Sequence, residues 1–505
     1  MQVQYTHKAV TINPMITKTL VKSPILSSKA KIAIIGGGVA GSTIALRFAE
    51  LGLDTTLIEK GPSLVNGPPI CHLHAGGNLY REISDQQCLT LLKQSIDTVK
   101  VYPNSVNIRP TIVALPTTDK GEPSDLLPRL TLLRNLYTDL VAQDISNKVL
   151  GEPEHYFKFY SREEIMALRH LPTPKIASKD SDWLITFAKY VDLKRIKFPV
   201  LLVQEHGLSA FRFAAIASLA IEKLPHCHLQ TNTQVTAMVP QAKGTGWQLV
   251  TKNVQSQTQA HQNFDYVINA CGFKSGEIDD MLSVKRQRMV EFKAAYVAHW
   301  PEAQGLWPEI VFYGERGTPQ GMAQLTPYPD GYFQLHGMTQ DITLFDQGLV
   351  ASCQQSAQPK LADKFIEKID KQWPEQLVQH RTLGSIEHLA QFIPAFSAAT
   401  TAAKPLFGAQ QIPGEDPDLR AADVSFDSQN YARAEIVKAS SALAASDAIL
   451  ANLIQSNLVD NTELGCYLTE HYFPVTLKCS AAEITKCANA LAEQREYPKA
   501  LAQNF

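Results

Sequence analysis

Four glycines within six consecutive positions have a spacing that brings a backbone close to a pyrophosphate. These positions read Gly36-Gly37-Gly38-Val39-Ala40-Gly41. Gly36 permits a tight turn, Gly38 has no side chain to hold the backbone away from phosphates, and Gly41 lets a helix pack closely on a strand. The N-terminus of that helix offers unpaired N–H groups and the positive end of its dipole. The pattern predicts the binding of a dinucleotide.

An acidic residue stands where the ribose of such a dinucleotide needs one. Glu59 follows Gly41 by 18 residues and closes a second strand-like run. Its carboxylate is therefore placed to accept hydrogen bonds from adenosine ribose hydroxyls. A carboxylate here disfavours a phosphorylated ribose, which favours FAD or NAD over NADP. We include the adjacent Lys60 among the cofactor contacts.

Strand and helix patterns surround these residues in the order that dinucleotide binding requires. Residues 31–35 and 55–58 are short apolar runs, and residues 42–51 have apolar side chains at helical spacing. A glycine pattern alone is weak evidence, because glycine-rich turns are common. Here a strand, the glycines, a helix, a second strand and a terminal acid fall in register. The alternative is a doubly wound domain with an empty crevice.

Later segments carry further strand and turn signals. Residues 264–272 have the pattern of a strand entering a glycine turn, and residues 229–235 and 247–251 are strand-like runs before it. Pro329-Asp330-Gly331 has turn chemistry between two strand-like runs, which predicts a hairpin.

Together these segments resemble the D-amino-acid oxidase superfamily of FAD-dependent oxidoreductases, in the neighbourhood of glycine oxidase and L-2-hydroxyglutarate dehydrogenase. Its members have a later strand written roughly Asp-x-Val-Val-Asn-Ala-Ala-Gly, and residues 265–272 match it with Cys271 in place of the second alanine. Residues 326–339 are similar to the family's Pro-x-x-Asp-Gly turn and following strand. The resemblance implies FAD, with the Val235 backbone beside the adenine and Ala270 and Gly272 beside the pyrophosphate.

The resemblance implies an α/β fold in which a Rossmann-like FAD-binding domain of the glutathione-reductase type is interleaved with a mixed-sheet substrate domain. Ser425-Phe426 would end the last cofactor strand, and a helix from about Tyr431 to Leu453 would direct its N-terminus at the flavin. Residues 427–430 stand where the family has a glycine-rich loop.

The expected domains are discontinuous. The FAD-binding domain takes residues 30–100, 200–285 and 385–458, and the substrate domain takes 101–199 and 286–384. Residues 1–29 are an N-terminal extension, and 459–505 are a C-terminal helical extension. In that extension Ser480-Ala481-Ala482-Glu483 is a capping box, which predicts a helix. We expect the helix to pack on the body, and docking of a partner is the alternative.

The segment Cys71–Arg81 is the most unusual part of the sequence. His72 and His74 alternate, so an extended chain would place both on one face. In the resembling family a loop at this distance lies along the flavin. We therefore add His74 to the candidate catalytic residues, and expect these cofactor contacts: His72, His74, Ala75, Gly76 and Gly77. The alternative is a tight structural loop, and with no third ligand in sight we expect no metal.

His336 is the second catalytic candidate, because it ends the strand that enters the active site in the resembling family. A histidine can act as a general base near neutral pH, although a hydrogen-bonded buried histidine is an equal alternative. Arg420 and Arg433 flank the last strand, and an arginine fork binds a substrate carboxylate well. A structural ion pair with an acid such as Asp418 is the alternative for each.

Composition excludes several functional classes. The chain has 505 residues, 47 Lys and Arg, 49 Asp and Glu and a net charge of −2. Such a chain has no global field for a nucleic acid, so the expected partner is a small-molecule substrate. No apolar run is long enough for a transmembrane helix, and the N-terminus does not have the pattern of a signal peptide. Scattered cysteines favour the cytoplasm, with peripheral contact to the inner membrane as an alternative.

We therefore expect an FAD-dependent oxidoreductase that moves a hydride from a small amino acid, amine or 2-hydroxy acid to flavin N5. Reoxidation would use oxygen or a quinone. The alternatives are a malate:quinone-type hydroxyacid dehydrogenase and a non-catalytic, FAD-holding subunit of a larger complex. An NAD-linked enzyme without flavin is a further reading of the glycine fingerprint.

Overall fold

The computed structural model describes residues 30–66, 81, 83–242, 244–303, 305–460 and 473–504. The glycine fingerprint follows β1, an inner strand of a six-stranded sheet with the order β20-β21-β12-β1-β2-β8. All its neighbouring strands pair in parallel except the edge pair β20 and β21. The strands are β1 (Lys31–Ile35), β2 (Asp54–Ile58), β8 (Cys227–Gln230), β12 (Tyr266–Asn269), β20 (Val424–Ser428) and β21 (Tyr431–Ala434).

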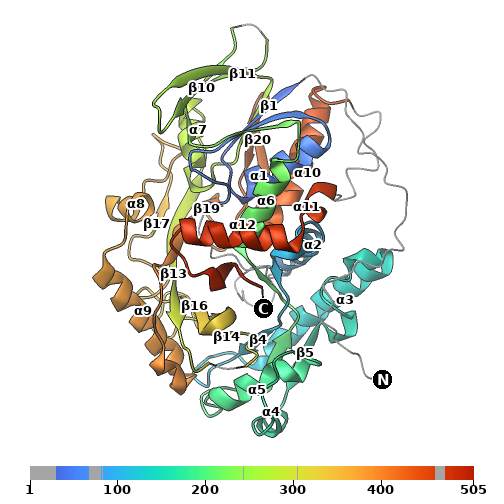
Figure 1. Ribbon diagram of the computed structural model, residues 1–505, viewed down its shortest axis with the longest axis vertical. Coiled ribbons are helices and arrows are strands. Elements are labelled where there is room, and N and C mark those ends of the chain that lie inside the picture. The colour runs from blue at the N-terminus through green and yellow to red at the C-terminus, as the bar shows by residue number, and fades with distance from the viewer. Residues whose placement is uncertain are drawn as a thin grey trace.

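This cofactor sheet is covered on both faces (Figure 1). Helices pack on one face through a shared apolar core: α1 (Val39–Glu50), α6 (Ala210–Ile221), α10 (Ala442–Gln455) and α12 (Ala481–Gln494). The other face is covered by a three-stranded meander and one helix: β9 (Thr233–Pro240), β10 (Trp247–Asn253), β11 (Gln259–Phe264) and α7 (Ser275–Met281). Buried strands of this kind are typical of parallel sheets.

A second, ten-stranded sheet has the order β17-β13-β16-β15-β14-β4-β6-β5, with β18 and β19 also pairing with β13. Its strands are β4 (Thr111–Ala114), β5 (Phe157–Tyr160), β6 (Val200–Val203), β13 (Arg288–His299), β14 (Glu309–Phe312), β15 (Ala323–Pro327), β16 (Tyr332–Gly337), β17 (Leu349–Ala351), β18 (Thr400–Thr401) and β19 (Leu406–Pro413). A further two-stranded ladder joins β3 (Val106–Asn107) to β7 (Gly207–Leu208).

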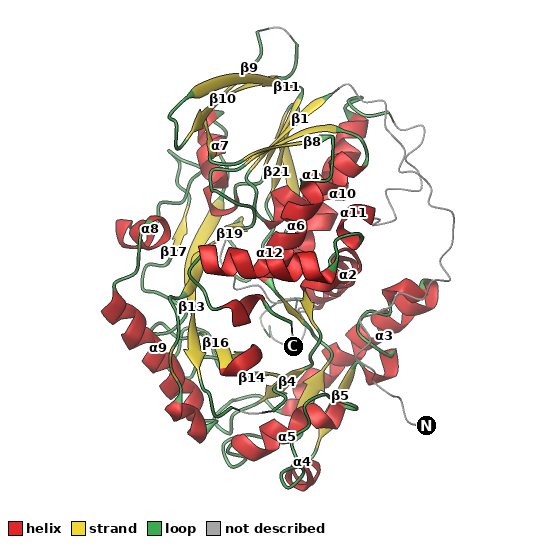
Figure 2. Ribbon diagram, in the orientation of Figure 1, coloured by secondary structure: helices red, strands yellow, loops and turns green. Residues whose placement is uncertain are grey.

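Different helices pack on the two faces of this large sheet (Figure 2). On its outer face one apolar core includes side chains of α4 (Arg162–Leu168), α5 (Asp180–Tyr190), α8 (Asp363–Asp370) and α9 (Glu375–Ala390). At the β4–β6 end the opposite face packs on α2 (Asp85–Val101) and α3 (Leu127–Gln143). The short α11 (Pro474–Leu477) precedes α12.

The 12-residue strand β13 belongs to the cores of both sheets. Phe292 and Tyr296 lie in the outer core of the large sheet. Ala295 and Val297 lie in the core of the cofactor sheet and its helices. Successive side chains of a strand point to opposite faces, so β13 has no face turned to water. We call the face that carries Ala295 and Val297 the inner face of the large sheet.

Several predicted elements are confirmed. The strand, fingerprint, helix and second strand form as expected, and residues 329–331 make the turn between the antiparallel strands β15 and β16. Ser480 and Glu483 form the predicted capping box at the start of α12. That helix packs on the body through its buried residues Ile484 and Ala488.

One expectation needs correction. The last cofactor strand is β21, so Tyr431 begins a strand, and the helix starts only at Ala442. The segment between them, residues 435–441, therefore stands in place of the expected glycine-rich loop, while residues 427–430 form the end of β20 and its two-residue link to β21. The strands β6 and β19 lie in the large sheet. Membership of a sheet depends on pairing partners far away in the chain.

In the part of the chain that the structure describes, no helix has the length and apolarity needed to cross a membrane.

Candidate dinucleotide and active site

Two glycines of the fingerprint are required by close backbone packing. Gly36 has φ +102°, and a Cβ there would lie 2.5 Å from the carbonyl oxygen of Ala270. A Cβ on Gly41 would lie 1.8 Å from the carbonyl oxygen of Gly36. These contacts hold α1 against the ends of β1 and β12, so the first turn of the helix is fixed at the strand ends.

Gly38 has a different role. It precedes α1 in an extended conformation, and a Cβ built there would have no neighbouring atom within 4 Å. No side chain caps this helix, and its first turn contains no acidic residue. The first N–H groups of α1 have no intrahelical partners, and among the described residues no atom fills the space beside Gly38, which fits the pyrophosphate of a dinucleotide.

Glu59 lies directly after β2 and is held by two backbone donors. Its carboxylate accepts hydrogen bonds from the backbone N–H groups of Gly37 and Gly61, each at 2.6 Å. Each carboxylate oxygen has a second lone pair, so the group can still accept from ribose hydroxyls. Lys60 beside it is exposed.

The end of β12 lies on the other side of this candidate pyrophosphate site. We call the fingerprint Gly36–Gly41, Glu59 and the β12 end together the cradle. Gly272 has φ +58°, and no atom lies within 4 Å of a Cβ built there. The backbone N–H of Ala270 donates to Ile35, and the Cys271 thiol donates to the same carbonyl at 3.3 Å. Burial raises the pKa of Cys271, so this thiol stays protonated at neutral pH. Val235 lies in β9, beside a shift in the register of its pairing with β10, with its side chain buried.

The inner face of the large sheet carries two groups of polar side chains, which we together call the polar line. Gln324 lies opposite His336 and Thr326 opposite Gln334 on β15 and β16, and Glu291 lies opposite Gln410 on β13 and β19. Between the two groups, Val297 of β13 lies opposite Gln334. The residues on this line are Glu309, Gln324, Thr326, Gln334, His336, Glu291, Lys293 and Gln410. A polar line inside a molecule costs free energy unless it is satisfied by partners, which makes this face a candidate active-site wall.

His336 is one member of this line. It is partly buried near the end of β16 and lies directly opposite Gln324 of β15. The Gln324 amide donates to Glu309, whose other oxygen pairs with Arg109 at 2.7 Å. Arg109 and Glu309 are almost completely enclosed. A fixed chain of polar groups therefore runs from this ion pair to the neighbour of His336.

Lys293 was not singled out by the sequence. Its ammonium donates to Gln410 at 3.1 Å and pairs with Glu291 at 2.6 Å, and Arg316 pairs with the other Glu291 oxygen. Burial lowers the pKa of Lys293 to about 8; Glu291 opposes this shift, while Arg316 and Arg420 add to it. Burial alone would raise the pKa of Glu291, but Lys293 and Arg316 lower it below its ordinary value.

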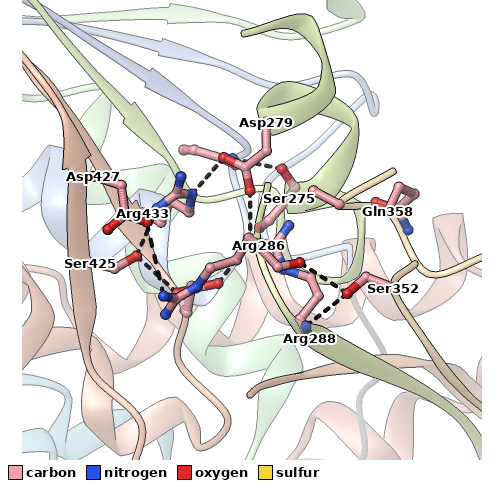
Figure 3. Close-up of polar contacts among 12 residues, drawn as sticks. Ser275, Asp279, Arg286, Arg288, Ser352, Gln358, Ser425, Asp427 and Arg433 are labelled. Atoms are coloured by element: carbon pink, nitrogen blue, oxygen red, sulfur yellow. Dashed lines mark hydrogen bonds and ion pairs between the residues drawn. The ribbon is translucent and has the colours of Figure 1, made fainter. Parts of the chain in front are cut away.

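Arg433 lies in a network of buried ion pairs shown in Figure 3. It is completely enclosed, and its guanidinium donates to Asp279 and Asp427 at 2.5 Å each. Burial by itself would lower the pKa of Arg433, but contact with Asp279 raises it further above its ordinary value. The guanidinium of Arg433, which we expected to bind a substrate carboxylate, thus donates to Asp279 and Asp427 of the protein itself.

The same network joins the cofactor sheet to the start of β13 (Figure 3). Arg288 pairs with Asp279 of α7 at 2.7 Å and with Glu435, directly after β21, at 2.8 Å. Arg286 pairs with the other oxygen of Glu435 at 2.7 Å. Three arginines and three carboxylates balance one another in this network, which ties the ends of β13 and β21 together.

A cavity of about 1020 Å³ lies beside this network. Its walls include Arg286, Ser352, Gly414, Asp427 and Glu435. Residues 419 and 421–424 also line it. Because Glu435 follows β21, the cavity borders the carboxyl end of a parallel strand, where open α/β sheets bind their ligands.

Arg420 lies within that lining segment but is itself mostly enclosed. Its guanidinium donates to the carbonyl groups of Pro417 and Leu419 at 2.8 Å each and lies 3.8 Å from Asp418. Its charge reaches Glu291 and Lys293 and lowers the pKa of both. The structure therefore brings Arg420 to the Lys293 neighbourhood and keeps Arg433 in the ion-pair network.

The remaining predicted contacts lie outside the described residues: His72, His74, Ala75, Gly76 and Gly77. Among the residues that are described, no group of three or more His, Cys, Asp or Glu side chains is placed to hold a metal ion.

Comparison with solved structures identifies relatives of this fold. Glycine oxidase from Geobacillus kaustophilus is similar with a TM-score of 0.53 and 13% identity, over 88% of this chain and 100% of that chain. L-Amino acid deaminase from Proteus myxofaciens matches with a TM-score of 0.53 and 11% identity, over 85% and 92%. L-Proline dehydrogenase from P. horikoshii matches with a TM-score of 0.50 and 16% identity, over 88% and 97%.

The family model for DAO, FAD dependent oxidoreductase, matches residues 31–83, which contain the fingerprint and Glu59. No curated protein sequence matches the chain significantly. Over residues 31–83 the chain therefore matches the family of FAD-dependent oxidoreductases, which supports FAD as the cofactor, and over the rest of the chain the solved structures show a shared fold.

Substitution of Gly38 by alanine separates cofactor binding from folding. Alanine meets no atom of the protein there, so Gly38→Ala should keep the wild-type melting temperature without FAD. The methyl group would occupy the space that the phosphates need, so the Kd for FAD should rise about tenfold or more, roughly 1.4 kcal/mol. Fluorescence titration of the cofactor-free protein measures this.

Gly41→Ala is the matched control, because its Cβ would overlap the Gly36 carbonyl and should prevent folding. Unchanged FAD affinity in Gly38→Ala would contradict the proposed position of the pyrophosphate.

Substitution of Asp279 tests the ion-pair network. Asp279→Asn leaves Arg288 and Arg433 buried with too few negative charges, so the free energy of unfolding should fall by about 3 kcal/mol. Urea unfolding measures the change. The control is Glu367→Gln, in an exposed pair with Lys371, which should cost no more than about 0.5 kcal/mol. Equal effects of the two variants would show that the network does not join the two sheets.

Proposed function

We propose that this enzyme oxidises a small amino acid, amine or 2-hydroxy acid, with oxygen or a quinone as the final electron acceptor. One observation carries the proposal: polar side chains of β14, β15 and β16, His336 among them, lie on the inner face of a sheet that packs against the FAD-binding cradle. FAD supplies the hydride acceptor when bound. The protein must then orient the substrate and take up a proton.

The cradle residues are proposed to hold FAD through backbone groups in a fold of the glutathione-reductase type. The α1 N-terminus and Gly38 would take the pyrophosphate, Glu59 and Lys60 the adenosine ribose, and the Val235 backbone the adenine. Residues at the β12 end would complete the pyrophosphate site. The predicted contacts at residues 72 and 74–77 belong to the same proposal.

His336 is proposed as the proton acceptor for the substrate's amine or hydroxyl group. It lies on the polar line, and its neighbour Gln324 is fixed through Glu309 and Arg109. A histidine side chain can accept a proton near neutral pH. His74 remains a second candidate from the sequence. The enzyme is proposed to work in the cytoplasm or at the inner surface of the membrane.

Visible spectroscopy without oxygen tests the function. The flavin absorbance should bleach on addition of pooled amino acids, pooled amines or pooled 2-hydroxy acids, because the substrate's electrons then remain on the cofactor. Delivery of electrons to a quinone after bleaching would identify the acceptor. A bound flavin that no pool bleaches would favour a non-catalytic, FAD-holding subunit.

Substitution of His336 tests its role. His336→Gln should lower the rate of anaerobic flavin reduction about 100-fold, the usual contribution of a general base, while FAD affinity stays unchanged. His380→Gln, on the exposed surface of α9, is the control and should reduce the flavin at the wild-type rate. Stopped-flow absorbance gives both rates. A wild-type rate in His336→Gln would exclude His336 as the proton acceptor.

A further inference from the structure

A cationic cluster on the inner face of the large sheet has no part in the function proposed so far. It consists of Lys293 and Glu291 of β13, Gln410 of β19 and Arg316, which follows β14; we call it the Lys293 cluster. The side chain of Lys293 is 13% exposed, that of Glu291 5% and that of Arg316 26%. The cluster is therefore mostly enclosed and open on the Arg316 side.

Positive charge exceeds negative charge in this cluster. Lys293 and Arg316 share the single carboxylate of Glu291, and among the described residues no other acid pairs with either cation. The charge of Arg420 adds to the positive field at both Lys293 and Glu291. An excess of buried charge is costly unless it gains a counter-ion. A second anionic group would therefore bind favourably here.

The two cations also keep hydrogen-bond donors for such a group. An ammonium group has three donors; Lys293 donates one to Gln410 and forms an ion pair with Glu291. A guanidinium group has five donors in a planar fork that matches an oxyanion, and Arg316 directs one amino group at Glu291. Glu291 thus holds both cations in place while leaving donors on each.

The position of the cluster connects it to the cofactor. The Gln410 amide donates at 2.9 Å to the carbonyl of Val437, in the segment between β21 and α10. The neighbouring Gln411 amide donates to Ala434, the last residue of β21. Ligands of open α/β sheets bind beyond the carboxyl ends of the parallel strands. The cluster therefore lies beside the place where substrate and cofactor are expected to meet.

We propose that Lys293 and Arg316 form the site that receives an anionic group of the substrate, a carboxylate or a phosphate. Glu291 is the positioning residue that holds the two cations ready. This inference rests on the proposed function and narrows it, because amines without an acidic group would not satisfy the site. Arg433 has no part in it, since the buried network uses its charge.

Calorimetric titration of the FAD-bound protein with small probes tests the site. Sodium acetate and inorganic phosphate are titrated at constant ionic strength, with acetamide as the neutral analogue of acetate. At least one of the two anions should bind and acetamide should not. The stronger anion distinguishes a carboxylate substrate from a phosphorylated one. Failure of both anions to bind would overturn the proposal.

Variants that remove or keep the charge of Lys293 test whether the anion binds at the Lys293 cluster. Lys293→Met should weaken the anion at least tenfold, and Lys293→Arg should retain most of the affinity. Lys120→Met removes one charge from an exposed lysine, 91% exposed and paired with Glu315 next to Arg316, and should change nothing. Equal anion affinity in the wild type and in folded Lys293→Met would overturn the proposal.

The variant Glu291→Gln distinguishes most clearly between a role of Glu291 in anion binding and a purely structural role. It removes the competing carboxylate, so the anion should bind several-fold more tightly, whereas a purely structural role for Glu291 predicts unchanged or weaker binding. Affinity should also fall as the pH rises through about 8 in the wild type and not in Lys293→Arg, because Lys293 then loses its charge. The charged groups that face Lys293 are Glu291, Arg316 and Arg420.

Anion binding and flavin reduction are measured separately, so the anion site and the proposed function can fail independently. Anion binding that depends on Lys293, in a protein whose flavin no substrate reduces, would count against the function alone. Rapid flavin reduction by neutral amines, with kcat/KM unchanged in Lys293→Met, would overturn the inference alone.

Discussion

The alternation of side chains along β13 is the constraint on which the rest of the structure depends. Its even-numbered residues, such as Phe292, fill the outer core of the large sheet, while Ala295 and Val297 fill the core of the cofactor sheet. A shift of one residue would reverse both faces and place Lys293 in the apolar outer core. The register of this single strand therefore fixes the distance between the polar inner face and the FAD cradle. The ion pairs between Arg288, Asp279 and Glu435 hold the start of the same strand.

Features that depend on local chemistry could be predicted from the sequence. The conformations that Gly36 and Gly41 require come from atoms within one turn and two strand ends, so the glycine pattern alone indicates them. The same holds for the turn at 329–331 and for the capping box of Ser480 and Glu483, whose hydrogen bonds connect near neighbours. The family model over residues 31–83 covers this same local part.

Features that depend on distant partners were missed. The residues of β21 continue the helical spacing of α10, so the sequence predicted one helix from Tyr431, although Tyr431–Ala434 pair with β12. An arginine in a buried strand is not expected from the local sequence. Arg433 is buried there because its charge is balanced by Asp279, which lies far away in the chain. The sequence did not indicate a role for Lys293. A strand that is buried on both faces lacks the alternation of apolar and polar residues that would show which side chains face inward. The membership of β6 and β19 in the large sheet also depends on long-range pairing.

A crystal structure of the protein with FAD tests the central claim most directly, namely that the cradle and the inner face of the large sheet enclose one active site. The account predicts the pyrophosphate at Gly38 and the α1 N-terminus, with the flavin ring between residues 435–441 and the inner face of β13 and β16. Lys293 and His336 would then both face the space in front of the ring. A flavin ring that points away from β13, with the polar line closed off from it, would contradict the account.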